Sequence, residues 1–190
     1  MLRITSAQIN PTIGDIDGNI ALMLDAARQA RLDGSNLVVF PEMSLTAYYP
    51  GDMLDERPFQ QRVEEGIHQL KLATREVPGV HWVVGAPVRR EGPGKAFYNA
   101  LLVIKNGEVL LQYAKQLLPT YNVFDERRHF EPGPEHGSRT LRIEGARVAF
   151  MICEDGWNDD GADYLVNPFS ELAHVMPDLV ISMNASPSNV

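Results

Sequence analysis

Cys153 is the one cysteine in this chain of 190 residues, and it is the first candidate for a nucleophile. It follows the apolar run 148–152 and precedes Glu154 and Asp155. A lone cysteine is more often a small packing residue than a reactive one. However, a nucleophile at the sharp end of a strand is held rigidly, and the next backbone N–H faces an oxyanion. Two acidic residues are also unusual beside a packing cysteine, so this context favours catalysis.

Glu42 and Lys115 occupy similar positions after two other apolar runs. Glu42 lies just past the run 37–40, and Lys115 directly follows the run 109–114. Each residue alone could be a solvated surface group. Open α/β folds, however, collect their functional groups at the carboxyl ends of strands. There the carboxylate could serve as a general base for a thiol, and the cation could favour thiolate and stabilise an oxyanion.

Apolar runs of strand length alternate with segments of helical period, which predicts a layered α/β fold. Hairpins are expected at Asn106-Gly107, at Glu144-Gly145 and in the segment 91–94. Asn19 is the expected cap of a first helix that Gly34 closes. The other expected helices are 59–77 and 168–175, and the expected strands are 2–9, 37–40, 81–86, 97–104, 109–114, 141–143, 147–152 and 179–183.

We find no internal repeat or linker in the sequence, so residues 1–190 are expected to form one domain. The last expected strand, 179–183, is followed by the segment 184–190 without a closing helix. That arrangement would leave an edge strand bare, so we expect the chain to be a fragment of a longer protein.

Composition excludes several classes of function. The net charge of −8 argues against nucleic acid as a partner, because phosphate binding needs clustered Lys and Arg. No apolar run approaches the roughly 18 residues of a membrane helix, and the N-terminus lacks the features of a signal peptide. With a single cysteine, these features predict a cytoplasmic protein. No metal site is expected, because no pair among the histidines has metal-ligand spacing: His68, His81, His129, His136 and His174.

Several segments resemble the nitrilase superfamily, whose members cleave carbon–nitrogen bonds with a Glu-Lys-Cys triad on an αββα sandwich. The resemblance is strongest to the glutaminase domain of glutamine-dependent NAD synthetases. The most specific matching segment is 115–126, Lys-Gln-Leu-Leu-Pro-Thr-Tyr-Asn-Val-Phe-Asp-Glu. The other matching segments are 7–11, 14–15, 18–19, 41–46, 127–130, 132–133 and 152–157. One departure is Ala47, where that family usually has glycine, which puts the shape of this loop in question.

The resemblance implies a four-layer αββα sandwich that is truncated at its C-terminal side, with a synthetase domain elsewhere in the full-length chain. It implies that Glu42 is the general base, Lys115 the oxyanion stabiliser and Cys153 the nucleophile. It also implies substrate-binding roles for another five residues: Glu126, Tyr121, Tyr48, Glu154 and Ser186.

The implied reaction is hydrolysis of the glutamine amide through a cysteine thioester. The ammonia would serve the ATP-dependent amidation of deamido-NAD to NAD. ATP and magnesium would belong to the synthetase domain, so no cofactor is expected in this chain. Glutamine is the expected small-molecule substrate, and a homo-oligomer is expected. Two alternatives remain: a stand-alone amidase of the superfamily that acts on another small amide, and a non-catalytic binding module with this fold.

Overall fold

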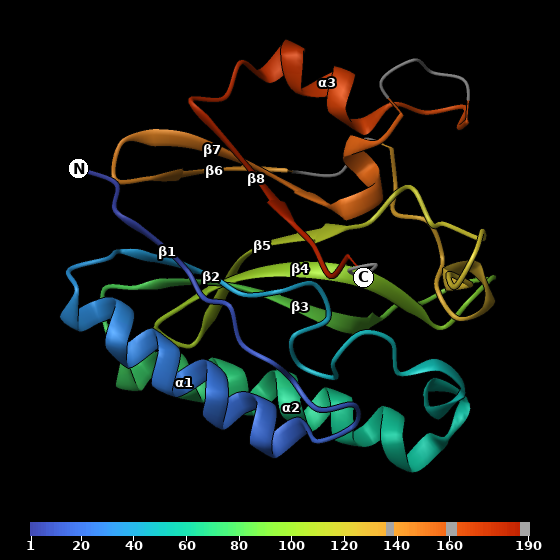
Figure 1. The fold of residues 1–190 in the computed structure, drawn as a ribbon, viewed down its shortest axis with the longest axis horizontal. Coiled ribbons are helices and arrows are strands. Elements are labelled where there is room, and N and C mark those ends of the chain that lie inside the picture. The colour runs from blue at the N-terminus through green and yellow to red at the C-terminus, as the bar shows by residue number, and fades with distance from the viewer. Residues whose placement is uncertain (136–138, 159–162, 187–190) are drawn as a thin grey trace.

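A computed structural model describes residues 1–135, 139–158 and 163–186, which form two β-sheets packed face to face with helices outside them (Figure 1). The five-stranded sheet has the order β1-β2-β3-β4-β5. Its strands are β1 (Ile4–Ser6), β2 (Leu37–Val39), β3 (His81–Arg89), β4 (Phe97–Lys105) and β5 (Glu108–Ala114). The three-stranded sheet has the order β6-β7-β8, with β6 (Thr140–Ile143), β7 (Ala146–Ile152) and β8 (Leu179–Met183).

Three α-helices cover the outer faces of these sheets. Helices α1 (Ile16–Leu32) and α2 (Arg57–Glu76) lie below the five-stranded sheet in Figure 1, and α3 (Pro168–Val175) lies above the three-stranded one. The loops contain three short 3₁₀ segments: η1 (Gly51–Asp55), η2 (Glu126–Arg128) and η3 (Cys153–Gly156). The layers therefore run helix, sheet, sheet, helix, which confirms the expected αββα sandwich.

Strand direction follows from how the chain connects the strands. β1, β2 and β3 are parallel and are joined by α1 and α2, as parallel pairs require a crossover. β3, β4 and β5 are antiparallel and are joined by short turns. At the turn between β4 and β5, Asn106 and Gly107 have φ values of 50° and 88°, as the expected hairpin turn requires. Glu144 and Gly145 repeat this conformation between β6 and β7, with φ values of 50° and 86°.

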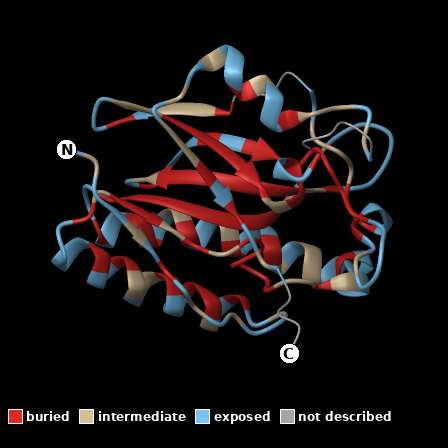
Figure 2. Cartoon of the chain, turned by 45° about the horizontal axis from the view of Figure 1, so that its top comes forward, coloured by how far each residue is buried: buried red, intermediate tan, exposed pale blue. Residues whose placement is uncertain are grey.

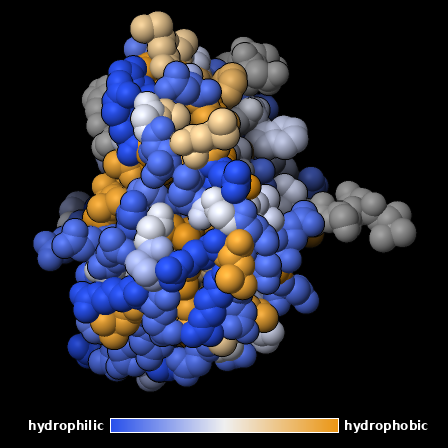
Figure 3. Space-filling view, turned by 90° about the vertical axis from the view of Figure 1, so that its left-hand side faces the viewer, coloured by the Kyte–Doolittle hydropathy of each residue, from blue (hydrophilic) through white to orange (hydrophobic). Residues whose placement is uncertain are grey.

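Two hydrophobic cores hold the layers together. One lies between α1, α2 and the five-stranded sheet and includes Met23, Val38 and Trp82. The other lies between the two sheets and includes Leu101 and Phe150. Figure 2 shows the buried residues running along the strands between the layers. Figure 3 shows the side of the molecule that lies at the left in Figure 1. This side is mostly hydrophilic, with scattered apolar side chains that are usual on a protein surface.

Two sequence expectations about the N-terminal region are wrong. The first strand is shorter than 2–9, because its ladder is limited to the three residues of β2. The first helix begins at Ile16, and its cap is Asp15, whose carboxylate accepts the Gly18 N–H, rather than Asn19. Asn19 is instead buried within α1, where its amide donates to the backbone carbonyls of Thr12 and Leu45 at 2.9 and 3.0 Å.

Most other expected elements agree with the structure within a few residues, and α3 and β8 have the expected bounds. Gly34 has a φ of 77° just after α1, which fits its expected role in ending that helix. Within the described ranges, no helix combines the length and apolar character needed to cross a bilayer. His136 and the final residues 187–190 lie outside the described residues.

Candidate active site

The side chains of Glu42 and Lys115 meet between the two sheets. Glu42 lies just past β2, and Lys115 directly follows β5. The ammonium Nζ of Lys115 donates to Glu42 Oε1 at 2.8 Å and to Glu126 Oε1 at 2.6 Å. All three side chains are almost fully buried, at 0–1% exposure. Glu126, expected to bind substrate, thus contacts Lys115 directly.

The loop that carries Glu42 is fixed against β3 by backbone hydrogen bonds. Leu45 N–H donates to the Gly85 carbonyl at 3.0 Å, and Gly85 N–H donates to Ser44 Oγ at 3.2 Å. A Cβ atom at Gly85 would lie 2.3 Å from the Met43 nitrogen, so only glycine allows this close approach. Ala47 in the same loop has a φ of 60°, so the loop keeps a conformation that favours glycine.

Asn99 and Tyr48 complete the hydrogen bonds of the two carboxylates. Asn99, on β4, donates from Nδ2 to Glu42 Oε1 at 2.8 Å and to Glu126 Oε2 at 3.2 Å. The Tyr48 hydroxyl donates to Glu126 Oε1 at 3.0 Å. Since burying a charge is costly unless it is paired and hydrogen-bonded, these donors offset part of the cost of burying the two carboxylates beside Lys115.

Charge coupling fixes the protonation of Lys115. Burial lowers the pKa of Lys115, but Glu42 and Glu126 outweigh that effect, and the net shift of its pKa is upward. The pKa of Glu126 is raised by burial, against the lowering by Lys115. Lys115 is therefore a fixed cation at neutral pH and is suited to stabilising negative charge rather than to accepting a proton.

Cys153 begins η3 at the end of β7 and has a φ of 41°, a strained conformation for a residue with a side chain. Its sulfur lies 3.9 Å from the Ser186 hydroxyl. Burial and then Glu42 raise the pKa of Cys153 from 9.0 to about 11, while Lys115 lowers it. Lys115 favours the thiolate, as expected, but burial and Glu42 outweigh its effect on the pKa, so the thiol form of Cys153 is favoured at neutral pH.

Asp155 joins the ends of β5 and β7. Its buried carboxylate accepts the N–H groups of Gln116 and Leu117 at 3.0 and 2.9 Å, just after Lys115. It also accepts the Ile152 N–H at 3.2 Å and the Tyr113 hydroxyl at 2.8 Å. Burial raises the pKa of Asp155 to about 6, against these donors, so it is ionised at neutral pH. Asp155 therefore sets the position of Lys115 relative to Cys153.

A cleft of about 520 Å³ opens beside Cys153 and has the size of a small-molecule pocket. Tyr121, Glu154 and Ser186, three of the expected substrate-binding residues, line it together with Cys153. The Glu154 carboxylate accepts the Tyr121 hydroxyl at 2.9 Å and the Tyr164 hydroxyl at 2.7 Å. The cleft thus offers a buried carboxylate, hydroxyl groups and a thiol.

Tyr48, another expected substrate-binding residue, lies in a neighbouring cleft with Glu42 and Ser186. Its hydroxyl contacts Glu126 rather than the cleft that holds Cys153. Ser186 lines both clefts and connects them. Six of the eight expected site residues therefore line two adjoining clefts, whereas Lys115 and Glu126 line neither and are buried next to Glu42 and Tyr48.

Comparison with known proteins identifies the family. Residues 3–173 match the model of the carbon-nitrogen hydrolase family. This chain belongs to the carbon-nitrogen hydrolase family. It is 38% identical over its whole length to the glutamine-dependent NAD(+) synthetase of Thermotoga maritima, of which it covers 31%. The chain thus spans about a third of the length of this relative.

Two solved structures show how widely the fold is shared. The glutamine-dependent NAD+ synthetase from Acinetobacter baumannii, in complex with ADP, has a TM-score of 0.85 and 31% identity, over 98% of this chain and 33% of that one. A Nesterenkonia AN1 amidase from the nitrilase superfamily has a TM-score of 0.82 over 99% of this chain and 66% of that one. Its identity of 22% supports a likeness of fold alone.

Sequence reasoning missed three residues at the site of this carbon-nitrogen hydrolase. Asn99 had a signal, because it is an amide inside the apolar run 97–104. Asp155 is an acidic residue beside a cysteine, but three of its four hydrogen-bond donors, Tyr113, Gln116 and Leu117, come from a distant segment. Tyr164 had no signal, because it lies in a loop and meets Glu154 through the fold alone.

Among described residues, one group of side chains has the distances of metal ligands: Asp52, Asp55 and His129. These residues do not line the cleft beside Cys153.

Proposed function

We propose that this chain hydrolyses the side-chain amide of glutamine, with Cys153 as nucleophile, Glu42 as general base and Lys115 as oxyanion stabiliser. The observation that carries the proposal is the buried contact of Lys115 with Glu42 and Glu126 beside a strained cysteine. Because the apolar surroundings strengthen these charges, the arrangement suits acyl transfer.

The proposed reaction begins with Cys153 protonated. Glu42 takes the thiol proton as the sulfur attacks the amide carbon, and the carbonyl oxygen becomes an oxyanion. Lys115 and the backbone N–H of Glu154 stabilise that oxyanion. Glu42 then passes its proton to the leaving nitrogen, so that ammonia departs and a γ-glutamyl thioester remains. Glu42 next activates a water molecule, which attacks the thioester and releases glutamate and the Cys153 thiol.

The cleft beside Cys153 supports an amino-acid amide as the substrate. Glu154 supplies a buried negative charge at 6% exposure, and the hydroxyls of Tyr121, Tyr164 and Ser186 surround the approach. A carboxylate in that position would attract the α-ammonium group of glutamine. A simple aliphatic amide has no ammonium group and would gain no such charge-assisted contact with Glu154.

We further propose that the ammonia serves an ATP-dependent amidation of deamido-NAD to NAD. Similarity to the glutamine-dependent NAD(+) synthetases supports this assignment, since two of them match nearly the whole chain. That second reaction would use ATP and magnesium and would belong to a longer protein of which this chain is about a third. The expected homo-oligomer would be an assembly of that longer protein.

The test uses a glutamine-analogue electrophile and mass spectrometry on the purified chain. We expect one adduct on Cys153, protection by glutamine, and hydrolysis of glutamine that Cys153→Ala abolishes. In a full-length protein, Cys153→Ala should abolish NAD synthesis from glutamine but preserve synthesis from free ammonia. Loss of both syntheses would contradict a role limited to amide cleavage.

A panel of amides separates the remaining alternatives. Faster turnover of acetamide or propionamide than of glutamine would favour a stand-alone amidase. No labelling of Cys153 and no hydrolysis of any amide would favour a non-catalytic module. A Glu108→Gln variant, at an exposed carboxylate at the opposite end of β5 from Lys115, is the matched control and should retain the parent turnover.

A further inference from the structure

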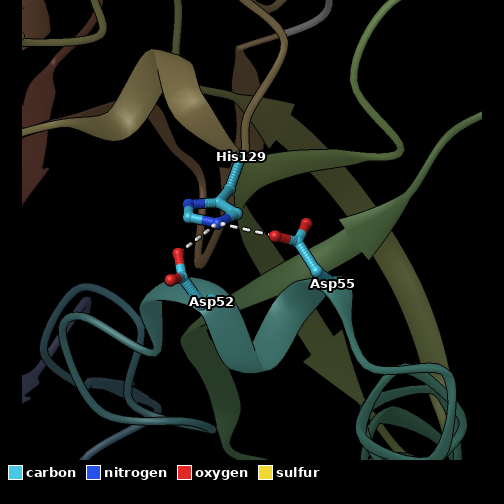
Figure 4. A group of neighbouring side chains, drawn as sticks. All are labelled: Asp52, Asp55 and His129. Atoms are coloured by element: carbon cyan, nitrogen blue, oxygen red, sulfur yellow. Dashed lines mark ion pairs between the residues drawn. The ribbon is translucent and has the colours of Figure 1, made fainter.

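A second cluster of ionisable groups lies where η1 faces the end of η2. His129 follows η2, and its imidazole points toward Asp52 and Asp55 of η1 (Figure 4). The two aspartates are three residues apart, a spacing that places side chains on one face of a 3₁₀ helix. One imidazole nitrogen and one oxygen from each carboxylate lie within 4.8 Å of one another.

The buried nitrogen Nε2 of His129 has no hydrogen-bond partner among the described residues. His129 is 5% exposed, so this nitrogen has little access to water. A buried polar atom without a partner is costly, and such atoms call for a specific explanation. The nearest groups to this nitrogen, Asp52 and Asp55, are acceptors with negative charge.

The other ring nitrogen shows which tautomer His129 adopts. Nδ1 of His129 is hydrogen-bonded to the Tyr49 hydroxyl, and that hydroxyl also donates to the Asp125 carbonyl at 3.1 Å. A hydroxyl has one proton, and the Tyr49 hydroxyl already donates it to the Asp125 carbonyl. Tyr49 therefore accepts from Nδ1–H. In neutral His129 this leaves a lone pair on Nε2 that faces two carboxylates.

The distances within the cluster match those between ligands of a small tetrahedral ion. Nε2 of His129 lies 3.3 Å from Asp52 Oδ1 and 3.5 Å from Asp55 Oδ2. Zinc bonds to His nitrogen and Asp oxygen are about 2.0–2.2 Å long, so tetrahedral geometry separates two such ligands by about 3.3–3.6 Å. The aspartate side chains are 70% and 69% exposed and can adjust to complete the geometry.

We propose that Asp52, Asp55 and His129 bind a divalent transition metal, with zinc as the ion that best suits the donor set. Calcium and magnesium prefer oxygen ligands alone, whereas an imidazole with carboxylates suits zinc. The Tyr49 hydroxyl on Nδ1 is the outer partner that metal-bound histidines usually have. This inference departs from the sequence expectation of no metal site, because the three ligands come together only in the fold.

Arg128 is the competing cation at this site. Its Nη2 lies 3.0 Å from the same Asp52 oxygen, but its side chain is 57% exposed and free to move into solvent. A bound ion would join η1 to the end of η2. Since η2 begins with Glu126, whose carboxylate contacts Lys115, the metal would act as a structural clamp on the loop that reaches the active site.

Calorimetric titration of Zn²⁺ into metal-free, untagged protein tests the proposal. A Cys153→Ser background removes the thiol as a competing zinc ligand. We expect one Zn²⁺ per chain, a higher melting temperature with Zn²⁺, and a visible Co²⁺ spectrum of tetrahedral type. Asp52→Asn and Asp55→Asn should each weaken Zn²⁺ binding at least tenfold, because each removes one of three ligands.

The matched control is Asp17→Asn. Asp17 is an exposed carboxylate paired with Arg62 in the way that Asp52 is paired with Arg128, but it has no histidine beside it. This variant should bind Zn²⁺ like the parent. Equal affinity in Asp52→Asn, Asp55→Asn and the parent would overturn the proposal. Absence of Zn²⁺ binding would also overturn it.

Discussion

Glu42→Gln should have opposite effects on hydrolysis and on the intrinsic reactivity of Cys153. The amide can still accept from Lys115 and Asn99 through one oxygen, so the local geometry is retained. It cannot take a proton, so glutamine turnover should fall on the order of 10²–10⁴-fold, the usual contribution of a general base. Alkylation of the thiol needs no such base and depends on the thiolate fraction.

The size of the alkylation effect follows from the raised pKa of Cys153. With a pKa of about 11 rather than 9.0, the thiolate fraction at pH 8 is lower by about a hundredfold. Glu42 is the largest cause of this shift after burial, and its removal leaves the lowering by Lys115 less opposed. Each unit by which the pKa falls gives about tenfold more thiolate but costs about threefold in nucleophilicity. Alkylation at pH 8 should therefore rise about threefold for each unit by which the Cys153 pKa falls in Glu42→Gln.

Iodoacetamide labelling, followed by mass spectrometry at pH 7–11, measures both quantities. In the parent protein, the alkylation rate of Cys153 should rise about tenfold per pH unit up to pH 10. The rate of an ordinary thiol, with a pKa of about 8.5, would level off at lower pH. Glu42→Gln should shift this profile to lower pH, and Glu108→Gln should not. A fall in alkylation that parallels the fall in hydrolysis would refute the reasoning, because it would mean that Glu42 promotes thiolate formation in the free site.

Three further substitutions test the surrounding contacts. Glu126→Gln should retain the fold by circular dichroism but lower kcat on the order of a hundredfold, because Lys115 loses one of its two charged partners and the new amide NH2 opposes the Asn99 donor; unchanged kinetics would contradict this. Asp155→Asn should cost roughly 2–4 kcal/mol in urea denaturation, since its amide would oppose the Ile152 N–H; a cost below about 1 kcal/mol would argue against this. Gly85→Ala should displace Met43 and Glu42, lowering both stability and turnover, whereas normal turnover would show that the loop adapts.

The layered fold could be predicted from the sequence because each element carried a local signal. The turns at 106–107 and 144–145 require positive φ values, which Asn106 and the glycine of each turn indicate. Helix α3 could be bounded from Pro168 and its apolar spacing. Helix α1 was misplaced at its start, because Asn19 has the chemistry of a cap but serves a buried contact with Thr12 and Leu45.

The site was only partly predictable, because its contacts join residues that are far apart in the chain. The strand ends at Glu42, Lys115 and Cys153 could be found from apolar runs followed by polar residues. The donors that hold the charges, Asn99 and the N–H groups around Asp155, depend on how the sheets are paired. The sign of the Cys153 pKa shift was also beyond sequence reasoning, since it depends on burial and on Glu42 together.

The hydrogen bonds of the buried charges also indicate which group should take the thiol proton. Lys115 keeps its proton, because Glu42 and Glu126 raise its pKa. Glu126 uses both oxygens: Oε1 accepts from Lys115 and Tyr48, and Oε2 accepts from Asn99. Glu42 accepts both of its hydrogen bonds from described residues at Oε1, and it borders a cleft with Ser186, whose hydroxyl contacts the Cys153 sulfur. Its second oxygen is thus available for a proton, which favours Glu42 over Glu126 as the base.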